Sequence, residues 1–544
     1  MENPLENKIS NNQIKGNSGS LLENTILVIL FLSIYGLIAY YFLFILQLHN
    51  GDALSRTANG YFVVYSREAP HLSAAGFVWQ PLMSLLQIPF FPFTKWIGEP
   101  AASGPLLTVI FGALTLPVLN QIGIVLGIKR IFRLISIFLY GINPTIILFS
   151  SMGYSETIFF FFMSIATLSL ILWALQRINN SSIIITGIAI ALAFWIRYEA
   201  IALSIGFALS VLIVVYIWTH NDPPLFKGSI EAVWISLIIP TAYSAAIWMF
   251  VNWLIQGDPL FFYRGEYQQI YYSEEFFSPA NVLYHDLFAS AGFILKQVTY
   301  STPIFPILII VICFLCLKRK TLLPLIPFTG PFAVILFHVY QNFQGFSWGW
   351  YRFASYMLPA TIPIVFWIMY LVKDKKTHLL LINSLLIVGL LGAIFTTSAG
   401  MITQEIAKEE TPLITSIMGG GNSYVPEDIS FSLSKKMASY INNNNIEGPI
   451  LLDTYSGFVI FLYADNPKDF IITPDTDFKE IINDPIKNEV KWIIISDPPK
   501  DEINIDLIRD AYPGLLEGKI PWAVKEKQFS KWYLFKVVPE LADG

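Results

Sequence analysis

The chain has 544 residues, of which 54% are hydrophobic and only 13% are charged. Soluble domains usually carry about 25% charged residues, so the composition excludes an ordinary soluble protein. The net charge is −5 at pH 7, and no long basic run is present. Nucleic acid is therefore excluded as a partner class on electrostatic grounds.

Apolar runs follow one another along most of the chain, and ten of them approach the length of about 20 residues that a membrane-spanning helix needs. They lie at 25–46, 104–127, 131–150, 155–176, 182–218, 230–254, 301–317, 321–340, 352–372 and 378–398. The fifth run is too long for one span and contains the polar residues Arg197 and Glu199 near its middle. We expect two helices that meet there, which gives about eleven transmembrane helices.

Basic residues in the short loops test this count, because Lys and Arg gather on the cytoplasmic side of a membrane protein. With a cytoplasmic N-terminus and a break at Arg197, every basic short loop falls on the cytoplasmic side. These loops contain Lys129, Arg130 and Arg133; Arg177; Lys227; Lys318, Arg319 and Lys320; and Lys373, Lys375 and Lys376. The C-terminal part is then extracytoplasmic.

We expect three parts: a polar cytoplasmic tail at 1–23, a transmembrane domain at 24–400 with a large first outer loop at 49–103, and a soluble domain at 401–544. The last part alternates strand-like runs with helix-like segments, which is typical of an α/β fold. The strand-like runs are 448–454, 458–463, 469–473 and 490–496, and the helix-like segments include 429–442 and 506–512. The fold class is thus an α-helical polytopic membrane protein with a C-terminal extracytoplasmic α/β domain.

The first outer loop begins with a carboxylate and an arginine, Asp52 and Arg56, just after the first span. On a helix these residues share a face, so a surface ion pair is one interpretation. The other is a catalytic base at Asp52 that takes a proton from an acceptor hydroxyl, with Arg56 facing an anion. Further along the loop, Glu68 and His71 are candidates for an acceptor sugar or a metal, but without a recognised ligand spacing we favour solvated loop residues.

A second carboxylate, Glu156, follows Tyr154 at the start of a strongly apolar run. Glu156 either favours the positive end of a helix or belongs to a polar site inside the bundle. Arg197 and Arg352 are candidates for binding a phosphate, because a guanidinium can make two parallel hydrogen bonds to it. The alternative for Arg352, which follows aromatic residues that include Trp348, is an anchor at the membrane interface.

The other long outer loop contains Asp258, Arg264 and several tyrosines. Aromatic rings stack on sugars, but they also populate membrane interfaces, and we favour the second interpretation here. The outer part contains no candidate for a structural disulfide, since Cys313 and Cys316 lie in an apolar run. This favours a prokaryotic plasma membrane.

Together these residues resemble the GT-C superfamily of polytopic glycosyltransferases, which use a sugar linked to a polyprenyl or dolichyl phosphate. Gly51-Asp52 stands where these enzymes have an acidic residue in the first outer loop. The segments Asn143-Pro144, Gly153 to Glu156 and Gly257 to Leu260, with Arg197, are similar to a series in GPI and related mannosyltransferases, and Arg352 to Pro359 is similar to an element of bacterial members.

The resemblance implies an inverting, mannosyltransferase-like transfer of a hexose from a polyprenyl-phosphate donor to a hydroxyl of a glycan, lipid or protein. Asp52 would be the base, and Arg56, Arg197 and Arg352 would bind the donor phosphate. The donor's tail would lie among membrane lipids. The candidates for binding donor or acceptor sugar are Glu68, His71, Tyr154, Glu156, Asp258, Arg264 and Trp348.

The chain also departs from family patterns. The first loop has no adjacent Asp-Glu pair and the outer loops have no Asp-x-Asp motif, so no motif supports a metal site and a divalent cation stays an open possibility. The absence of Trp-Trp-Asp disfavours transfer of a whole glycan to asparagine. The main rival functions are a transporter or a lipid-linked sugar flippase, and a third is a non-catalytic assembly subunit. Transporters often have repeated halves, and none is apparent here.

Overall fold

The computed structural model describes residues 18–175, 180–219, 223–265, 283–347, 349–373, 376–419, 426–497 and 506–542. The chain divides into two compact units. The helical unit consists of Met1–Tyr41 and Thr108–Asn422, and the mixed unit consists of Phe42–Leu107 and Ser423–Gly544. The predicted domains assigned the first outer loop to the transmembrane part, whereas the structure groups it with the C-terminal segment.

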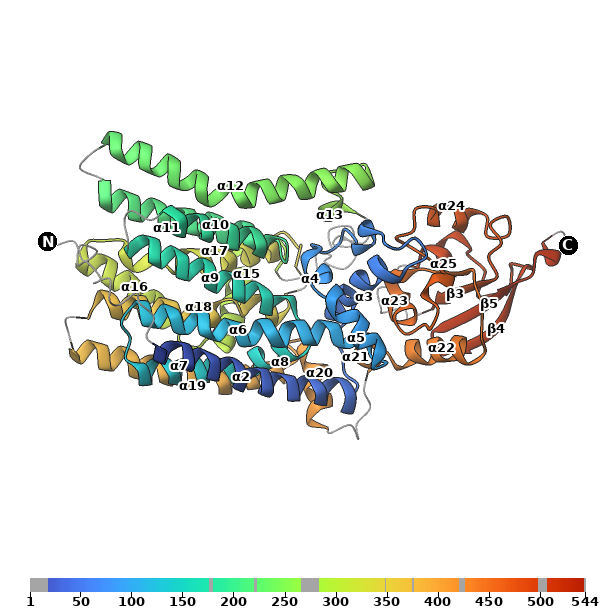
Figure 1. The fold of residues 1–544 in the computed structure, drawn as a ribbon, viewed down its shortest axis with the longest axis horizontal. Helices are drawn as coiled ribbons and strands as arrows, with labels where there is room; N and C mark the ends of the chain where they lie inside the picture. Colours follow the sequence, from blue (N-terminus) through green and yellow to red (C-terminus); the bar gives the residue numbers. More distant parts are fainter. Residues whose placement is uncertain are drawn as a thin grey trace. The chain divides into compact units, whose positions relative to one another are not determined.

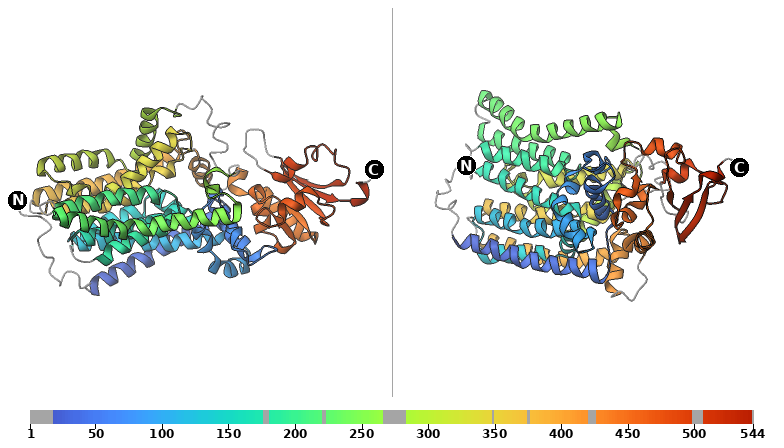
Figure 2. Two further views of the ribbon diagram at one scale, coloured as in Figure 1. Left: turned by 90° about the horizontal axis from the view of Figure 1, so that it is seen from above. Right: turned by 45° about the vertical axis from the view of Figure 1, so that its right-hand side comes forward.

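The helical unit is built from long apolar helices that lie side by side (Figures 1 and 2). The described residues contain 7 helices that are long and apolar enough to cross a membrane, and up to 9 if two bent pairs each count as one span. The long helices include α2 (Ser18–Tyr40), α6 (Ser103–Val125), α9 (Ser155–Leu175), α11 (Ala200–Thr219), α12 (Pro223–Gln256), α18 (Met357–Leu371) and α19 (Lys376–Met401). The chain is therefore a polytopic membrane protein.

The predicted number of about eleven spans differs from this count because several expected spans are short or bent. The run 131–150 forms α7 (Arg130–Gly141) and α8 (Pro144–Ser151), which meet at 60°. Near 301–317, α15 (Leu287–Ser301) and α16 (Phe305–Arg319) meet at 102°. The run near 321–340 contains α17 (Thr329–Phe343), which has only 15 residues.

The predicted break in the longest apolar run is confirmed. Helix α10 (Asn180–Phe194) ends before Trp195, and α11 starts at Ala200. Helix α10 packs closely on α12 at Gly187. A Cβ atom at this position would lie only 2.6 Å from the carbonyl oxygen of Ser236, so only glycine fits without a shift. Small residues allow such close approach between helices in a membrane. The break leaves Arg197 and Glu199 in a short connection between two apolar helices.

The mixed unit contains a sheet of five strands, β1 (Ile450–Leu452), β2 (Phe470–Ile472), β3 (Trp492–Ser496), β4 (Ala523–Phe529) and β5 (Trp532–Val537), in its described residues. Their order is β2-β1-β3-β5-β4. Strand β1 is parallel to β2 and β3, and β5 is antiparallel to β3 and β4. The expected α/β domain is confirmed, although β4 and β5 were not predicted.

The predicted strand at 458–463 is wrong, because these residues lie mostly in helix α23 (Thr454–Leu462). Asp453 caps this helix by accepting a hydrogen bond of 2.8 Å from the backbone N–H of Tyr455. Short apolar runs do not distinguish a strand from a buried helix. Val459, Ile460 and Phe461 are all buried on this helix, and the run therefore lacks the alternation of a half-buried strand.

The two faces of the sheet have separate apolar cores. Ile450 and Leu452 face α22 (Ser432–Asn443) and α23, whereas Leu451 faces α24 (Phe478–Asn483) and α25 (Leu507–Ala511). The first outer loop completes the former core through α3 (Gly51–Tyr65), where the ring centroid of Phe62 lies 5.0 Å from that of Phe461. Helix α3 is thus packed into the same core as the C-terminal segment.

Candidate functional site

Glu156 lies in the first turn of α9, inside the helical unit. The chain reaches this position through a turn at Gly153, whose φ of +82° favours glycine, and the backbone N–H of Gly153 donates to Thr108 Oγ1 at 3.1 Å. Glu156 is fully buried. A carboxylate is stabilised near the N-terminus of a helix, but its burial among apolar helices also requires charged partners.

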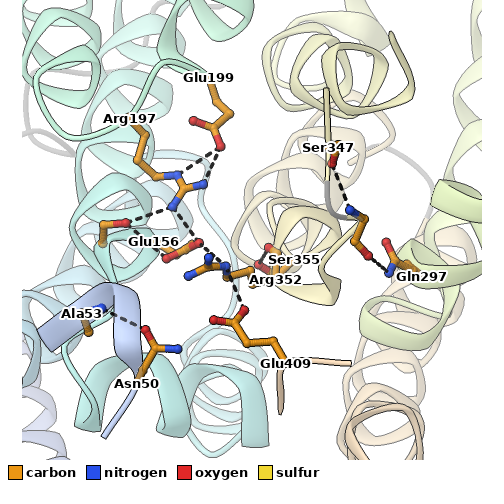
Figure 3. Close-up of polar contacts among 12 residues, drawn as sticks. Asn50, Ala53, Glu156, Arg197, Glu199, Gln297, Ser347, Arg352, Ser355 and Glu409 are labelled. Atoms are coloured by element: carbon orange, nitrogen blue, oxygen red, sulfur yellow. Dashed lines mark hydrogen bonds and ion pairs between the residues drawn. The ribbon is translucent and has the colours of Figure 1, made fainter. Parts of the chain in front are cut away.

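Arg197 supplies one of these partners from the break between α10 and α11. Its Nη1 donates to Glu156 Oε1 at 2.7 Å and to Ser155 Oγ at 2.9 Å. Its Nη2 donates to Glu199 Oε1 at 2.6 Å, and its Nε donates to the same oxygen at 3.1 Å (Figure 3). The guanidinium thus sits between two buried carboxylates.

Glu199 extends these contacts to two further helices. The Tyr356 hydroxyl donates to Glu199 Oε1 at 2.9 Å, and His338 Nε2 lies 3.7 Å from the same oxygen. Tyr356 directly precedes the first residue of α18, whereas His338 lies on α17. The break at Arg197 is therefore fixed by polar contacts from elements far apart in the sequence.

Arg352 is the second buried guanidinium of the site and lies in η6 (Tyr351–Ala354). Its Cζ lies 4.2 Å from the ring centroid of Trp350. Its Nε lies 3.7 Å from Glu156 Oε1 and 3.1 Å from Glu409 Oε2 (Figure 3). Glu156 therefore connects the two arginines.

We call Glu156, Arg197, Glu199, Arg352 and Glu409 the ionic cluster. It contains two cations and three carboxylates. The neighbouring Glu410, at the start of α20 (Glu410–Met418), is also fully buried. Burial raises the pKa of Glu410 to about 7, although the charge of Arg352 opposes this shift. Carboxylates thus outnumber the cations around Arg352.

Tyr154 also belongs to this region. Its ring is buried and stacks on Phe149 with a centroid distance of 4.7 Å, and the Cζ of Arg352 lies 5.9 Å from the Tyr154 centroid. The structure therefore brings together four of the residues that the sequence singled out. These four residues are Tyr154, Glu156, Arg197 and Arg352.

Asp52 and Arg56 lie in the mixed unit, on α3. Asp52 is half-buried in the first turn, after Asn50 caps the helix by accepting a 2.9 Å hydrogen bond from the backbone of Ala53. Arg56 is buried, with its Cζ 4.4 Å from the ring centroid of Trp79. Burial raises the pKa of Tyr455 to about 12, and the charge of Asp52 adds to this shift. The Asp52 carboxylate therefore acts electrostatically on the start of α23.

Glu68 makes contacts that fasten the first outer loop to the segment after β2. Its Oε1 accepts a 2.8 Å hydrogen bond from the Thr476 hydroxyl, and its Oε2 lies 3.5 Å from His71 Nδ1. The preceding Arg67 pairs with Asp477. These contacts give Glu68 and His71 a structural part in the mixed unit.

Asp258 and Arg264 bind each other. Arg264 Nε and Nη2 donate to the two oxygens of Asp258 at 2.7 and 2.9 Å, and Asp258 Oδ1 also accepts from the backbone of Leu260 at 3.0 Å. This exposed pair closes a local turn after α12. Trp348, the remaining predicted sugar-binding residue, lies outside the described residues. Within the described residues, no group of three His, Cys, Asp or Glu side chains is arranged to hold a metal ion.

The sequence did not single out Glu409, Tyr356 and His338. Glu409 follows the last apolar run, where the rising density of charged residues indicated a water-facing domain. Tyr356 and His338 lie within apolar runs and had no pattern that set them apart from ordinary helix packing. The one signal that the sequence offers for these residues is that each is a polar residue inside or after an apolar run.

Comparisons with solved structures identify the fold. ArnT from Cupriavidus metallidurans bound to undecaprenyl phosphate aligns with a TM-score of 0.53 and 13% identity, over 95% of this chain and 98% of that one. Its apo state gives a TM-score of 0.52 at 13% identity, over 95% of this chain and 99% of that one. A third structure is the Archaeoglobus fulgidus oligosaccharyltransferase AglB in complex with an inhibitory peptide and a dolichol-phosphate. It aligns with a TM-score of 0.42 and 13% identity, over 86% of this chain and 69% of that one.

A scan against known protein families gives no match, and neither does a search of curated proteins. At 13% identity the likeness to ArnT concerns the fold. The chain therefore shares the fold of the ArnT structure.

Proposed function

We propose that this chain is a membrane glycosyltransferase that moves a hexose from a polyprenyl-phosphate donor to an acceptor hydroxyl. The observation that carries the proposal is the pair of buried arginines, joined through Glu156, in a chain with the fold of ArnT. Buried charges inside a membrane bundle are costly and are functional candidates by default. The ArnT structure that shares this fold is bound to undecaprenyl phosphate, which supports a lipid-linked donor here.

Of the two arginines, Arg352 is the better candidate for touching the donor phosphate. Arg197 already directs Nε and both of its Nη atoms at Ser155, Glu156 and Glu199. Arg197 therefore holds Glu156 in place, and Glu156 in turn helps to orient Arg352. A positioned guanidinium stabilises the negative charge that develops on a departing phosphate. Arg56 is a further candidate for this contact.

The proposed reaction is a single inverting displacement with Asp52 as the base. Asp52 takes the proton of the acceptor hydroxyl while the hydroxyl oxygen forms a bond to the anomeric carbon. The bond between that carbon and the phosphate oxygen breaks, and polyprenyl phosphate leaves with the electron pair. The new bond forms on the side of the anomeric carbon opposite to the phosphate, so the configuration at this carbon is inverted.

We further propose a cytoplasmic N-terminus and an extracytoplasmic mixed unit in a prokaryotic plasma membrane, because this arrangement places the basic short loops inside. Mannose is the first sugar to test, since the segments around Asn143, Glu156 and Asp258 resemble those of mannosyltransferases. The acceptor is a glycan, lipid or protein hydroxyl at the outer face of the membrane.

The proposal is tested with the purified chain in detergent, where no sealed compartment exists. Labelled polyprenyl-phosphate-mannose is supplied with an extract of envelope glycans and lipids, and release of polyprenyl phosphate is measured. A glycosyltransferase transfers label to an acceptor under these conditions. A flippase leaves the donor intact in detergent but moves it across sealed vesicles, and that pair of results would overturn the proposal.

A further inference from the structure

We propose that Glu409 is an internal carboxylate that the donor's phosphate displaces from Arg352, so that Glu409 sets how tightly the donor binds. This inference rests on the proposed function, because it deepens the role of Arg352 in that reaction. It adds a residue, Glu409, that follows the last long span and that the sequence did not indicate.

The contact between the two side chains is close and largely shielded from solvent. Arg352 Nε lies 3.1 Å from Glu409 Oε2, and the two side chains are 4% and 18% exposed. Arg352 also stacks on Trp350, which fixes the plane of the guanidinium. A carboxylate on this guanidinium uses the same edge that would bind an oxygen of a phosphate.

The surrounding charges indicate that Glu409, and not Glu156, is the carboxylate that leaves Arg352 when a phosphate binds. Glu156 is fully buried in the first turn of α9 and is held by Arg197 at 2.7 Å, whereas Glu409 has a more exposed side chain at the end of a connecting segment. A donor phosphate that joined Arg352 while Glu409 stayed in place would add another anion beside Glu156 and Glu409, which lie 3.7 and 3.1 Å from Arg352 Nε. Like charges at short range in a poorly hydrated site repel strongly, so binding of the phosphate is expected to accompany movement of Glu409.

The experiment measures binding of undecaprenyl phosphate to the purified full chain in detergent. Glu409→Gln is expected to lower the concentration for half-saturation about tenfold, because it removes the competing charge while keeping the side chain's shape. Glu409→Asp keeps the charge and is expected to bind less tightly than Glu409→Gln. The matched control is Glu405→Gln on the same segment, whose carboxylate is 85% exposed and lies 4.0 Å from Lys296 Nζ; no change is expected for it.

Two further measurements identify the side chain at which Glu409 competes and the ligand with which it competes. The gain from Glu409→Gln is expected to disappear when Arg352→Gln is added, because the competition takes place at that guanidinium. The same titration is made with inorganic phosphate. A gain for inorganic phosphate without one for undecaprenyl phosphate would overturn the proposal, since the ligand would then be a free anion.

The failure of this inference can be told apart from the failure of the proposed function. If wild-type protein binds undecaprenyl phosphate through Arg352 and Glu409→Gln binds no tighter, Glu409 is a fixed structural partner and the inference is wrong. If neither wild-type protein nor any variant binds undecaprenyl phosphate, the proposed function itself fails.

Discussion

The two units of the molecule place charged side chains in different settings. In the helical unit, Glu156, Arg197 and Arg352 are buried among apolar helices, and each has an oppositely charged partner from another segment. In the mixed unit, Arg67 and Asp477 form an ion pair whose side chains are 32% and 41% exposed. Buried ion pairs seldom add net stability compared with apolar packing, so the charges of the helical unit are better explained by chemistry than by folding.

Removing Glu156 is expected to produce the largest loss of stability. Glu156→Ala leaves two buried guanidinium groups short of a carboxylate, and breaking a buried pair in this way costs about 3–5 kcal/mol. The free energy of unfolding is measured by denaturant titration in detergent. Ser155→Ala is the control, because it removes one hydrogen-bond acceptor of Arg197 and one donor to Glu156 but no charge, and it is expected to cost about 1–2 kcal/mol. Equal losses of unfolding free energy in both variants would contradict the view that charges hold the ionic cluster together.

The stability of the mixed unit is expected to depend on pH. Burial raises the pKa of Asp506 to about 7 from an ordinary value of 3.8, and the charge of Asp453 adds to the shift. Between these pH values the folded state binds more protons than the unfolded state, so the free energy of unfolding falls as pH rises, by at most about 1.4 kcal/mol per pH unit.

Hydrogen exchange of β3 amides in the full chain measures this dependence, after correction for the intrinsic exchange rates. Asp506→Asn is expected to flatten the profile between pH 4 and pH 7. The matched control is Glu526→Gln, an exposed position on β4, which is expected to leave the profile unchanged. An unchanged profile in Asp506→Asn would exclude this carboxyl as the source.

The exposed ion pair of the mixed unit is expected to give the smallest effect. Asp477→Ala removes one partner of Arg67 and leaves Asp475 Oδ2 at 3.4 Å, and screened pairs at the surface contribute only about 0–1 kcal/mol. The same denaturant titration as for Glu156→Ala makes the comparison direct. A loss above about 2 kcal/mol would mean that this pair fastens the first outer loop more firmly than its exposure indicates.

The sequence indicated the helical unit's site because charge is rare inside apolar runs. Arg197 interrupted a run that was too long for one helix, and the structure has its break there. Tyr154, Glu156 and Arg352 stood beside apolar runs in the same way. Glu409 escaped notice because it lies among many charged residues, where one more carboxylate carries no signal. Its partner Arg352 is 57 residues earlier in the chain, and no local pattern links the two.

The fold of the mixed unit was predictable only in part. The runs around Ile450, Phe470 and Trp492 are short, apolar and bounded by polar residues, and they form strands. Strand β4 was not predicted because its exposed charged residues, such as Lys525 and Glu526, interrupt the apolar pattern. Helix α3 was predicted as a possible helix in an outer loop, but its packing on α23 is a long-range contact that local periodicity does not encode.

The most direct test of the account compares the transfer of sugar by wild-type protein and by Asp52→Asn. In the detergent assay with polyprenyl-phosphate-mannose, loss of the base is expected to lower the rate about 100-fold or more, while expression and membrane insertion stay normal. Asp428→Asn, an exposed acidic position on α21 (Glu427–Ser430) of the same unit, is expected to keep the wild-type rate. Full activity in Asp52→Asn would contradict the assignment of the base and the mechanism built on it.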